Sequence, residues 1–188
     1  MCGIVGIISS KEVTGRILNS LKKLEYRGYD SAGIATLVDG NINEVKCEGR
    51  VEVLEKDISK FNLKGDIGIG HVRWATHGKP SKINAHPHSS EHVSVVHNGI
   101  IENSTILKKF LEKKGYIFKS QTDTEVIAHL VTEYLKKNSI KDTIIKVLKK
   151  LHGSFALGII FKAQSNLMVG AKSCLLYTSP SPRDETKS

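Results

Sequence analysis

The order of strand-like and helix-like segments restricts the fold of this chain more than any other feature of its sequence. We expect strands at residues 3–8, 32–38, 42–48, 67–74, 93–97, 154–161 and 166–171. We expect helices at residues 11–25, 51–60, 102–114, 123–137 and 140–151. Strands and helices fall into groups rather than regular βαβ repeats, which favours an α+β domain with sheets covered by helices.

Short signals between these segments support the assignment. Residues 39–41 (Asp-Gly-Asn) separate two strand segments and predict a hairpin turn. Thr122 and Glu125 have the spacing of a capping box, which predicts that a helix begins near residue 123. Residues 75–91 are rich in His, Pro, Ser and Asn, so we expect a long loop there. A long loop between core strands is usually functional.

Composition limits the class of protein. The 188 residues suffice for one well-buried domain. No apolar run approaches the ~20 residues of a membrane span, and no signal peptide is recognisable. The net charge of +9 comes mostly from Lys, with few Arg, whereas specific nucleic-acid recognition favours Arg. We interpret the lysines as solvated helix faces and expect neither a nucleic-acid nor a membrane partner.

The three cysteines are too few and too scattered for a disulfide framework or a zinc site. They are Cys2, Cys47 and Cys174. A reducing cytoplasm is the simplest compartment for such a chain. Cys47 lies in a strand segment, and we interpret it as structural.

Cys2 directly follows the initiator methionine and precedes a short apolar strand. Removal of Met1 would place a thiol and a free α-amine on one residue. An α-amine has a pKa of about 7.7–8.0, so it can serve the thiol as a general base near neutral pH. A cysteine at this position alone is weak evidence, because an incidental cysteine is the more common case.

Other segments supply what such a nucleophile needs. At Asn98-Gly99 we expect a strand to end and the chain to turn, which offers a side-chain amide and an exposed backbone N–H as donors to an oxyanion. Arg73 and Thr76 lie where a strand opens into the long loop and could bind a carboxylate. Asp123, in the first turn of a helix, could pair with an ammonium group.

Each of these residues also has an ordinary structural interpretation: a plain turn, a surface ion pair or a helix-dipole contact. Residues 86–88 (His-Pro-His) lack a third ligand at useful spacing, so we expect no metal. Taken together, a carboxylate clamp, an ammonium partner, an oxyanion hole and a thiol suit an amino acid with a side-chain amide. The substrate that fits this description is glutamine.

Six separate motifs carry a family resemblance. In chain order they are CGIVG (2–6), LEYRGYDSAG (24–33), HVRWATHG (71–78), NAHPH (84–88), VHNGIIEN (96–103) and TDTEVIAHL (122–130). Residues 1–172 thereby resemble the N-terminal glutaminase domain of the glutamine–fructose-6-phosphate aminotransferase (isomerizing) family, among the class II glutamine amidotransferases. Amidophosphoribosyltransferases differ by a Gln after Arg-Gly, where this chain has Tyr29.

The resemblance implies an N-terminal nucleophile hydrolase fold, a four-layer α/β/β/α sandwich with two mainly antiparallel sheets. It implies that Cys2 attacks the glutamine amide carbon, with Asn98 and Gly99 as the oxyanion hole. It also implies a set of substrate-binding residues, namely Arg73, Thr76 and His77 at the α-carboxylate and Asp123 at the α-amine. No metal or organic cofactor is implied.

The same resemblance implies that Arg27 and Gly28 orient the terminus and that Trp74 lies towards the ammonia exit. Family members are several times longer, with two sugar-isomerase domains that use fructose 6-phosphate, and they form homo-oligomers. Residues 173–188 resemble nothing in the family, and we expect a non-family tail, disordered or artefactual, after a C-terminally incomplete domain. Cys174 belongs to that tail and receives no role.

Two alternatives stay open at this point. The first is the glutaminase domain of another class II amidotransferase, such as an amidophosphoribosyltransferase, since the acceptor part would decide between them. The second, from another class, is a Lys-rich binding module for acidic partners. That alternative predicts an affinity that falls steeply with salt.

Overall fold

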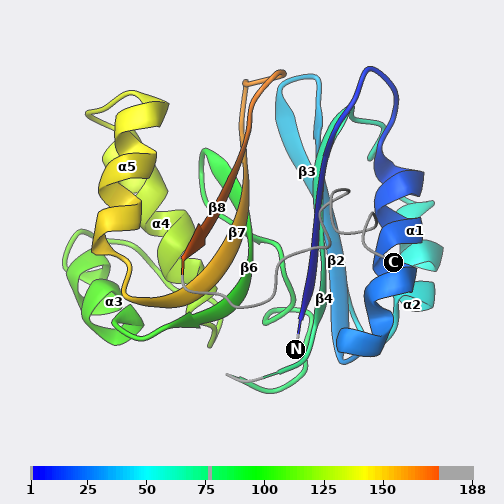
Figure 1. The fold of residues 1–188 in the computed structure, drawn as a ribbon, viewed down its shortest axis with the longest axis horizontal. Helices are drawn as coiled ribbons and strands as arrows, with labels where there is room; N and C mark the ends of the chain where they lie inside the picture. Colours follow the sequence, from blue (N-terminus) through cyan, green and yellow to red (C-terminus); the bar gives the residue numbers. More distant parts are fainter. Residues whose placement is uncertain (1, 76–77, 174–188) are drawn as a thin grey trace, which may run out of the picture.

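The computed structural model describes residues 2–75 and 78–173 of the chain. Two β-sheets pack face to face, and helices cover the outer face of each, giving four layers (Figure 1). The strands are β1 (Gly3–Ile8), β2 (Ser31–Val38), β3 (Asn41–Glu48), β4 (Ile67–Arg73), β5 (His88–Ser89), β6 (Val93–Ile101), β7 (Gly153–Phe161) and β8 (Met168–Ser173). The helices are α1 (Thr14–Leu24), the 3-10 turn η1 (Glu25–Arg27), α2 (Val51–Ile58), α3 (Ser104–Glu112), α4 (Thr124–Leu135) and α5 (Ile140–Lys150).

The first sheet has the strand order β1-β4-β2-β3 and is antiparallel throughout. Helices α1 and α2 cover its outer face (Figure 1). Glycines on β4 let α1 approach closely, since a Cβ at Gly70 would lie 2.5 Å from the Ile17 side chain. The face of this segment that packs on the sheet carries Val13, Ile17 and Leu21, which are fully buried, and Leu24, which is partly buried.

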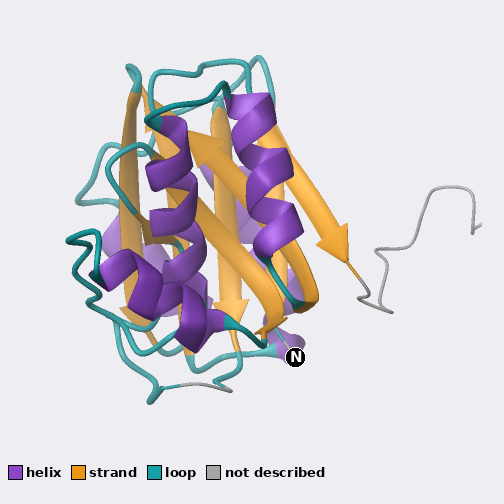
Figure 2. Cartoon of the chain, turned by 90° about the vertical axis from the view of Figure 1, so that its left-hand side faces the viewer, coloured by secondary structure: helices purple, strands orange, loops and turns teal. Residues whose placement is uncertain are grey.

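The second sheet has the order β5-β6-β7-β8 and is also antiparallel. Helices α3, α4 and α5 lie over its outer face (Figure 2). Helix α4 is the most deeply buried of the three: Val126, Ile127, Leu130 and Val131 are buried, and Tyr134 is partly buried. A third apolar cluster fills the space between the sheets with Ala35, Leu37, Ile67, Ile69, Val96 and Ile160. The predicted α/β/β/α architecture is therefore confirmed.

Two local predictions were wrong. Strand β6 does not end before Asn98-Gly99 but continues to Ile101, because its pairing with β7 runs unbroken to Gly153. The capping box is also absent: Thr122 makes no cap to helix α4, and the Glu125 carboxylate instead accepts hydrogen bonds from the backbone N–H groups before the helix.

Other differences are small. Arg27, expected on a loop, ends the 3-10 turn η1, and the expected long loop contains the two-residue strand β5. Strand β8 is shifted towards the C-terminus, so Ser173, the first residue of the expected tail, still pairs with Phe155. The rest of that tail, including Cys174, lies outside the described residues.

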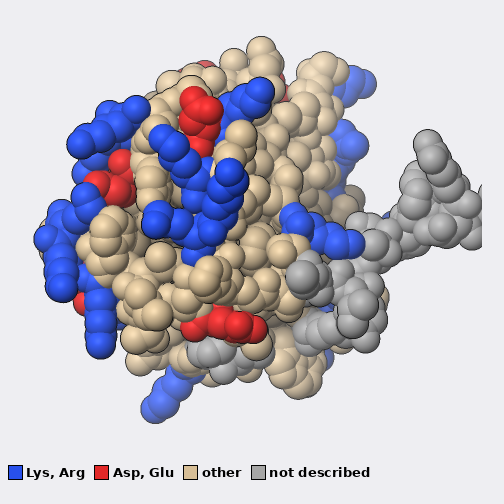
Figure 3. Space-filling model, turned by 60° about the vertical axis from the view of Figure 1, so that its left-hand side comes forward, with Lys and Arg blue, Asp and Glu red and all other residues tan. Residues whose placement is uncertain are grey.

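Lysines gather on the solvent face of the α3–α5 layer (Figure 3). Lys109, Lys113, Lys149 and Lys150 are all exposed there, as expected for solvated helix faces. Among the described residues, no helix is long and apolar enough to span a membrane.

Candidate active site

Cys2 lies immediately before β1, and its thiol contacts the backbone of Trp74, the residue that follows β4. The Trp74 N–H donates to Cys2 Sγ at 3.4 Å, and Sγ lies 3.6 Å from the Trp74 carbonyl oxygen. Burial raises the pKa of the Cys2 thiol, while the Trp74 hydrogen bond and the nearby Arg73 charge oppose that rise. The thiol is therefore protonated at neutral pH and needs a base to act as a nucleophile.

Asn98 reaches Cys2 from the other sheet. Its side-chain Nδ2 donates to the Cys2 carbonyl oxygen at 3.2 Å, which connects β6 to the start of β1. Gly99 follows with φ of 134°, and a Cβ there would lie 2.1 Å from the Ser154 carbonyl oxygen. A residue with a side chain cannot fit there without moving β7, so glycine is required within the strand rather than at a turn.

Arg73, the last residue of β4, is buried although it carries a charge. Its Nη2 donates to the Gly78 carbonyl oxygen at 3.3 Å, and Nη1 lies 3.8 Å from Asp30 Oδ1. The guanidinium group thus contacts Gly78, which directly follows the two other predicted carboxylate ligands. Those two residues, Thr76 and His77, lie outside the described residues.

Asp123 occupies the N-cap position of α4. Its Oδ2 accepts the Ile101 N–H at 2.8 Å, and its Oδ1 lies 3.8 Å from His97 Nδ1. The first contact ties the helix to the end of β6, three residues beyond Asn98 along the same strand. The structure therefore places the predicted ammonium partner and the predicted oxyanion donor on one rigid support.

The remaining predicted site residues are Gly28, Trp74 and Arg27, and they differ in how closely they approach Cys2. A Cβ at Gly28 would lie 2.5 Å from the Arg73 carbonyl carbon, so only glycine lets the two backbones meet. Trp74 is 48% exposed, and its ring packs edge-on against Tyr29 with centroids 5.7 Å apart. Arg27 contacts its neighbour Tyr26 instead of the thiol, so the structure does not bring it to Cys2.

A cluster of buried histidines lies behind the site. His71 Nε2 bonds to the His97 carbonyl oxygen at 2.9 Å, and Thr124 Oγ1 bonds to both His86 Nε2 and His97 Nδ1. Burial lowers the pKa of His71 to about 3 and that of His86 well below its ordinary value. The His71 and His86 rings are therefore neutral, and the cluster supports β4, β6 and the start of α4 through its hydrogen bonds. Among the described residues, no cluster of three or more His, Cys, Asp or Glu side chains could hold a metal ion.

Sequence reasoning assigned no role to Asp30 or Thr124, although both lie inside recognised motifs. Thr124 joins two histidines, and the Asp30 carboxylate accepts from the Ala75 N–H and the Ser31 hydroxyl. A signal for Asp30 existed, since it is an acid placed between glycines in a short turn. Its partners Arg73 and Ala75, however, are more than 40 residues away in sequence, and only the fold reveals them.

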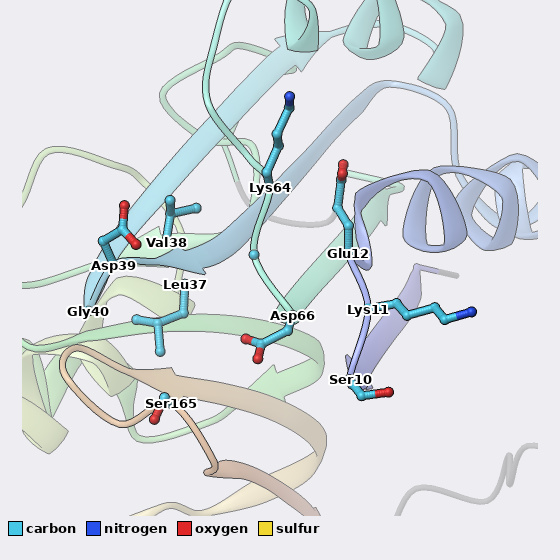
Figure 4. A pocket seen from close by; sticks show the side chains of 11 residues that line it. Ser10, Lys11, Glu12, Leu37, Val38, Asp39, Gly40, Lys64, Asp66 and Ser165 are labelled. Carbon is cyan, nitrogen blue, oxygen red and sulfur yellow. The ribbon is translucent and has the colours of Figure 1, made fainter.

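A separate hollow of about 400 Å³ opens at the far end of β1, away from Cys2. Asp39 and Asp66 line it beside Leu37, while the Lys11 side chain extends away from the others (Figure 4). None of the predicted site residues lines this hollow. The candidate site is therefore defined by the convergence at Cys2 and not by this depression.

The layered fold, with a cysteine leading an edge strand, defines the class of N-terminal nucleophile amidotransferases. Residues 71–174, more than half of the chain, match the family described as the glutamine amidotransferase domain. The chain belongs to this family, as the motifs predicted.

Proteins named glutamine–fructose-6-phosphate aminotransferase (isomerizing) are similar over nearly the whole chain. That of Clostridium acetobutylicum is 52% identical over 174 residues, which cover 92% of this chain and 28% of that protein. That of Bartonella henselae is 51% identical over 92% of this chain and 29% of that protein. The chain thus spans less than a third of the length of these relatives.

The solved structures support the same fold. The glutamine phosphoribosylpyrophosphate amidotransferase from B. subtilis aligns with a TM-score of 0.76 and 31% identity, covering 92% of this chain and 37% of that one. A structure titled as the allosteric regulatory enzyme of purine biosynthesis aligns with a TM-score of 0.74 and 33% identity, covering 86% and 35%. Identity to the aminotransferases is higher over a comparable span.

Proposed function

We propose that this chain hydrolyses L-glutamine to glutamate and ammonia through a thioester on Cys2. The observation that carries the proposal is the convergence of two segments, one from each sheet, on Cys2. The Trp74 backbone contacts the Cys2 thiol, and the Asn98 amide donates to the Cys2 carbonyl oxygen. A protonated, half-buried thiol in this position is suited to activation by a base on its own residue.

The proposed reaction begins once Met1 has been removed. The free α-amine of Cys2 takes the thiol proton as the sulfur bonds to the amide carbon of glutamine, giving a tetrahedral oxyanion. The Asn98 side-chain amide and the Gly99 N–H stabilise that negative charge. The α-amine then passes the proton to the leaving nitrogen, the C–N bond breaks, and ammonia departs. Water attacks the thioester, releasing glutamate and restoring the thiol.

The substrate is held at both ends of its amino-acid group. We assign the α-carboxylate to Arg73 with Thr76 and His77, and the α-ammonium to Asp123. A buried guanidinium and a nearly buried carboxylate attract opposite charges strongly because little water screens them. We assign Trp74, which is half exposed, to the side from which ammonia would leave, and Gly28, which packs against the Arg73 carbonyl, to the support of the terminus. Arg27, which contacts Tyr26 instead, is left out of this assignment.

The acceptor of the ammonia is proposed from the relatives. Their name implies transfer to fructose 6-phosphate, giving a glucosamine phosphate, in parts of the protein that this chain does not span. We expect the whole protein to be a cytoplasmic homo-oligomer with these additional domains. The higher identity to aminotransferases than to the purine enzymes favours this acceptor over a ribosyl phosphate.

An electrophilic glutamine analogue tests the proposal. We expect it to modify the Met-processed chain once, on the peptide that contains Cys2, and excess glutamine to protect that residue. The Cys2→Ala variant should neither be labelled nor release ammonia, whereas Cys47→Ala, which removes a buried cysteine, should do both. Labelling elsewhere, or glutamine hydrolysis by Cys2→Ala, would refute the proposal. Retention of Met1 should abolish activity, because the base would then be an amide.

A further inference from the structure

Asp30 lies between the turn η1 and strand β2, and its carboxylate is mostly buried, with 19% of the side chain exposed. The Ala75 N–H donates to Oδ2, and the Ser31 hydroxyl donates to Oδ1 at 2.9 Å. Arg73 Nη1 lies 3.8 Å from Oδ1. The backbone N–H of Asp30 also donates to the Arg73 carbonyl oxygen at 3.2 Å. Both its carboxylate oxygens and its amide are therefore engaged.

These contacts fall on the residues either side of Trp74. Asp30 holds the Arg73 carbonyl on one side and the Ala75 N–H on the other. Between them, the Trp74 N–H and carbonyl are the groups that contact Cys2 Sγ. The Arg73 carbonyl and the Trp74 N–H belong to one peptide group, and the Trp74 carbonyl and the Ala75 N–H belong to the next. Asp30 thus holds both peptide groups that contact the sulfur, the first through its backbone N–H and the second through its carboxylate, so their orientation towards Cys2 depends on Asp30.

We propose that Asp30 is a positioning residue for the Cys2 nucleophile, acting through the backbone of residues 73–75. Its consequence for catalysis rests on the glutaminase function proposed above. Asp30 itself does not contact the thiol. It sets the peptide that does, and it also steadies Arg73, the residue assigned to the substrate carboxylate.

The contacts distinguish this role from that of an ordinary ion pair. At 3.8 Å the approach to Arg73 is long for a charged hydrogen bond, whereas the Ala75 N–H makes a direct one to the carboxylate. An Asn at position 30 has one acceptor oxygen. Ala75 and Ser31 donate to different oxygens of the carboxylate, so an Asn in the same position keeps the shape but loses one of the two contacts.

The charge of Asp30 and the Trp74 hydrogen bond that Asp30 supports have opposite effects on the pKa of the Cys2 thiol, so their losses can be told apart. The negative charge of Asp30 raises the pKa of Cys2, whereas the Trp74 N–H lowers it. Removing the charge alone would therefore lower the thiol pKa and speed its alkylation near neutral pH. Releasing the Trp74 peptide would remove a hydrogen bond to the sulfur, raise the thiol pKa and slow alkylation.

The experiment follows alkylation of Cys2 by iodoacetamide from pH 6 to 10, read by mass on the N-terminal peptide of the Met-processed chain. For Asp30→Asn we expect a higher apparent pKa and a rate at pH 7 that is at least about threefold lower, since half a pKa unit changes the thiolate fraction by that factor. The control Asp57→Asn removes a carboxylate that pairs with Lys60 on the surface, and should match the parent chain.

Two further measurements keep the result interpretable. Labelling of Cys47, which is 4% exposed, reports any loss of the fold in each variant. If Asp30→Asn labels Cys47, Ser31→Ala replaces it, because it removes only one hydrogen bond to the carboxylate and should slow Cys2 alkylation in the same direction. An unchanged or faster Cys2 alkylation in the folded variants would overturn the inference.

The alkylation does not involve glutamine, so it separates the two proposals. A parent chain that fails to hydrolyse glutamine refutes the glutaminase function, while its Cys2 alkylation still judges the role of Asp30. Where the parent chain is active, we expect Asp30→Asn to lower kcat by about tenfold or more, because misplacement of a reacting group is costly. Asp30→Glu should not restore kcat, since the longer side chain displaces the same peptide.

Discussion

The side-chain amide of Asn98 donates to the carbonyl oxygen of Cys2 across 3.2 Å, joining a strand of one sheet to the first strand of the other. The two residues are 96 positions apart in sequence, so this bond forms only when the sandwich has closed. The proposed nucleophile and the proposed oxyanion donor thus come into register through the packing of the sheets.

Replacing Asn98 by Ala should impair the chemical step more than substrate binding. Loss of one oxyanion donor typically lowers kcat by about 10²–10³-fold. We expect the KM for glutamine to change much less, because Asn98 is not assigned to either end of the amino-acid group. Steady-state ammonia release against glutamine concentration measures both constants.

Asn43→Ala is the matched control for this variant. Asn43 also donates a side-chain hydrogen bond to a backbone oxygen, that of Asn62, but it does so on the far edge of the first sheet. We expect its loss to cost about 1 kcal/mol of stability without affecting kcat. Equal kcat in Asn98→Ala and Asn43→Ala would argue against the oxyanion role.

Gly28→Ala should damage the site through its backbone. The added Cβ would lie 2.5 Å from the Arg73 carbonyl carbon and 2.7 Å from the Trp74 nitrogen, so the peptide against the thiol has to move. We expect a fall in kcat of about tenfold or more. Gly15→Ala is the control, because nothing lies within 4 Å of a Cβ there and the residue is helical. It should instead stabilise the fold by about 0.5–1 kcal/mol.

Asp123→Asn should weaken glutamine binding. An Asn at this position can still accept the Ile101 N–H, so the link between β6 and α4 is retained, but the negative charge is lost. A hydrogen bond to a charged group contributes about 1.5–3 kcal/mol, which predicts a KM raised at least about tenfold. Unfolding in urea checks that stability is kept. A KM equal to that of the parent chain would contradict the assignment of Asp123 to the ammonium group.

The buried histidines predict loss of stability in mild acid. Burial lowers the pKa of His71 and His88 to about 3, whereas the unfolded chain protonates them near pH 6.5. Below that pH the unfolded state binds protons that the folded state does not. Stability is therefore full above pH 6.5 and falls towards pH 3, by up to about 1.4 kcal/mol per pH unit for each histidine.

Urea unfolding between pH 4.5 and 7.5 measures this dependence. We expect His88→Gln to reduce the slope, because one buried imidazole no longer contributes to it. His152→Gln, at an exposed position, should leave the slope unchanged. A free energy of unfolding that stays constant from pH 7.5 to 4.5 would show that the histidines are not kept neutral by burial.

Much of this architecture could be predicted from local patterns. The apolar faces of α1 and α4, the hairpin between β2 and β3, and the glycines of β4 have signals within a few residues of one another. The identity of the site residues likewise came from short motifs. Such signals are reliable where the chain's periodicity and its burial agree.

The errors share a different cause. Asn-Gly predicts a turn locally, yet Asn98 pairs with Ala156 and Gly99 with Phe155 of β7, so the strand continues. Thr122 has the spacing of a cap, but its hydroxyl bonds to His88 and Ser120 instead. In each case a distant segment satisfied a polar group that local reasoning had assigned to a neighbour. The role of Asp30 was missed for the same reason.

The pairing of β1 with β4 begins at Gly3, opposite Val72, so Cys2 directly precedes the first paired residue. The pairing of β1 with β4 fixes the position of the amino terminus. Each residue added before Cys2 would extend the chain by about 3.3 Å into the space where, in the proposed reaction, the glutamine amide approaches. Expression of an active protein therefore depends on what is fused to it. Purification tags belong at the carboxyl end, and any cleavable leader has to leave Cys2 as the first residue.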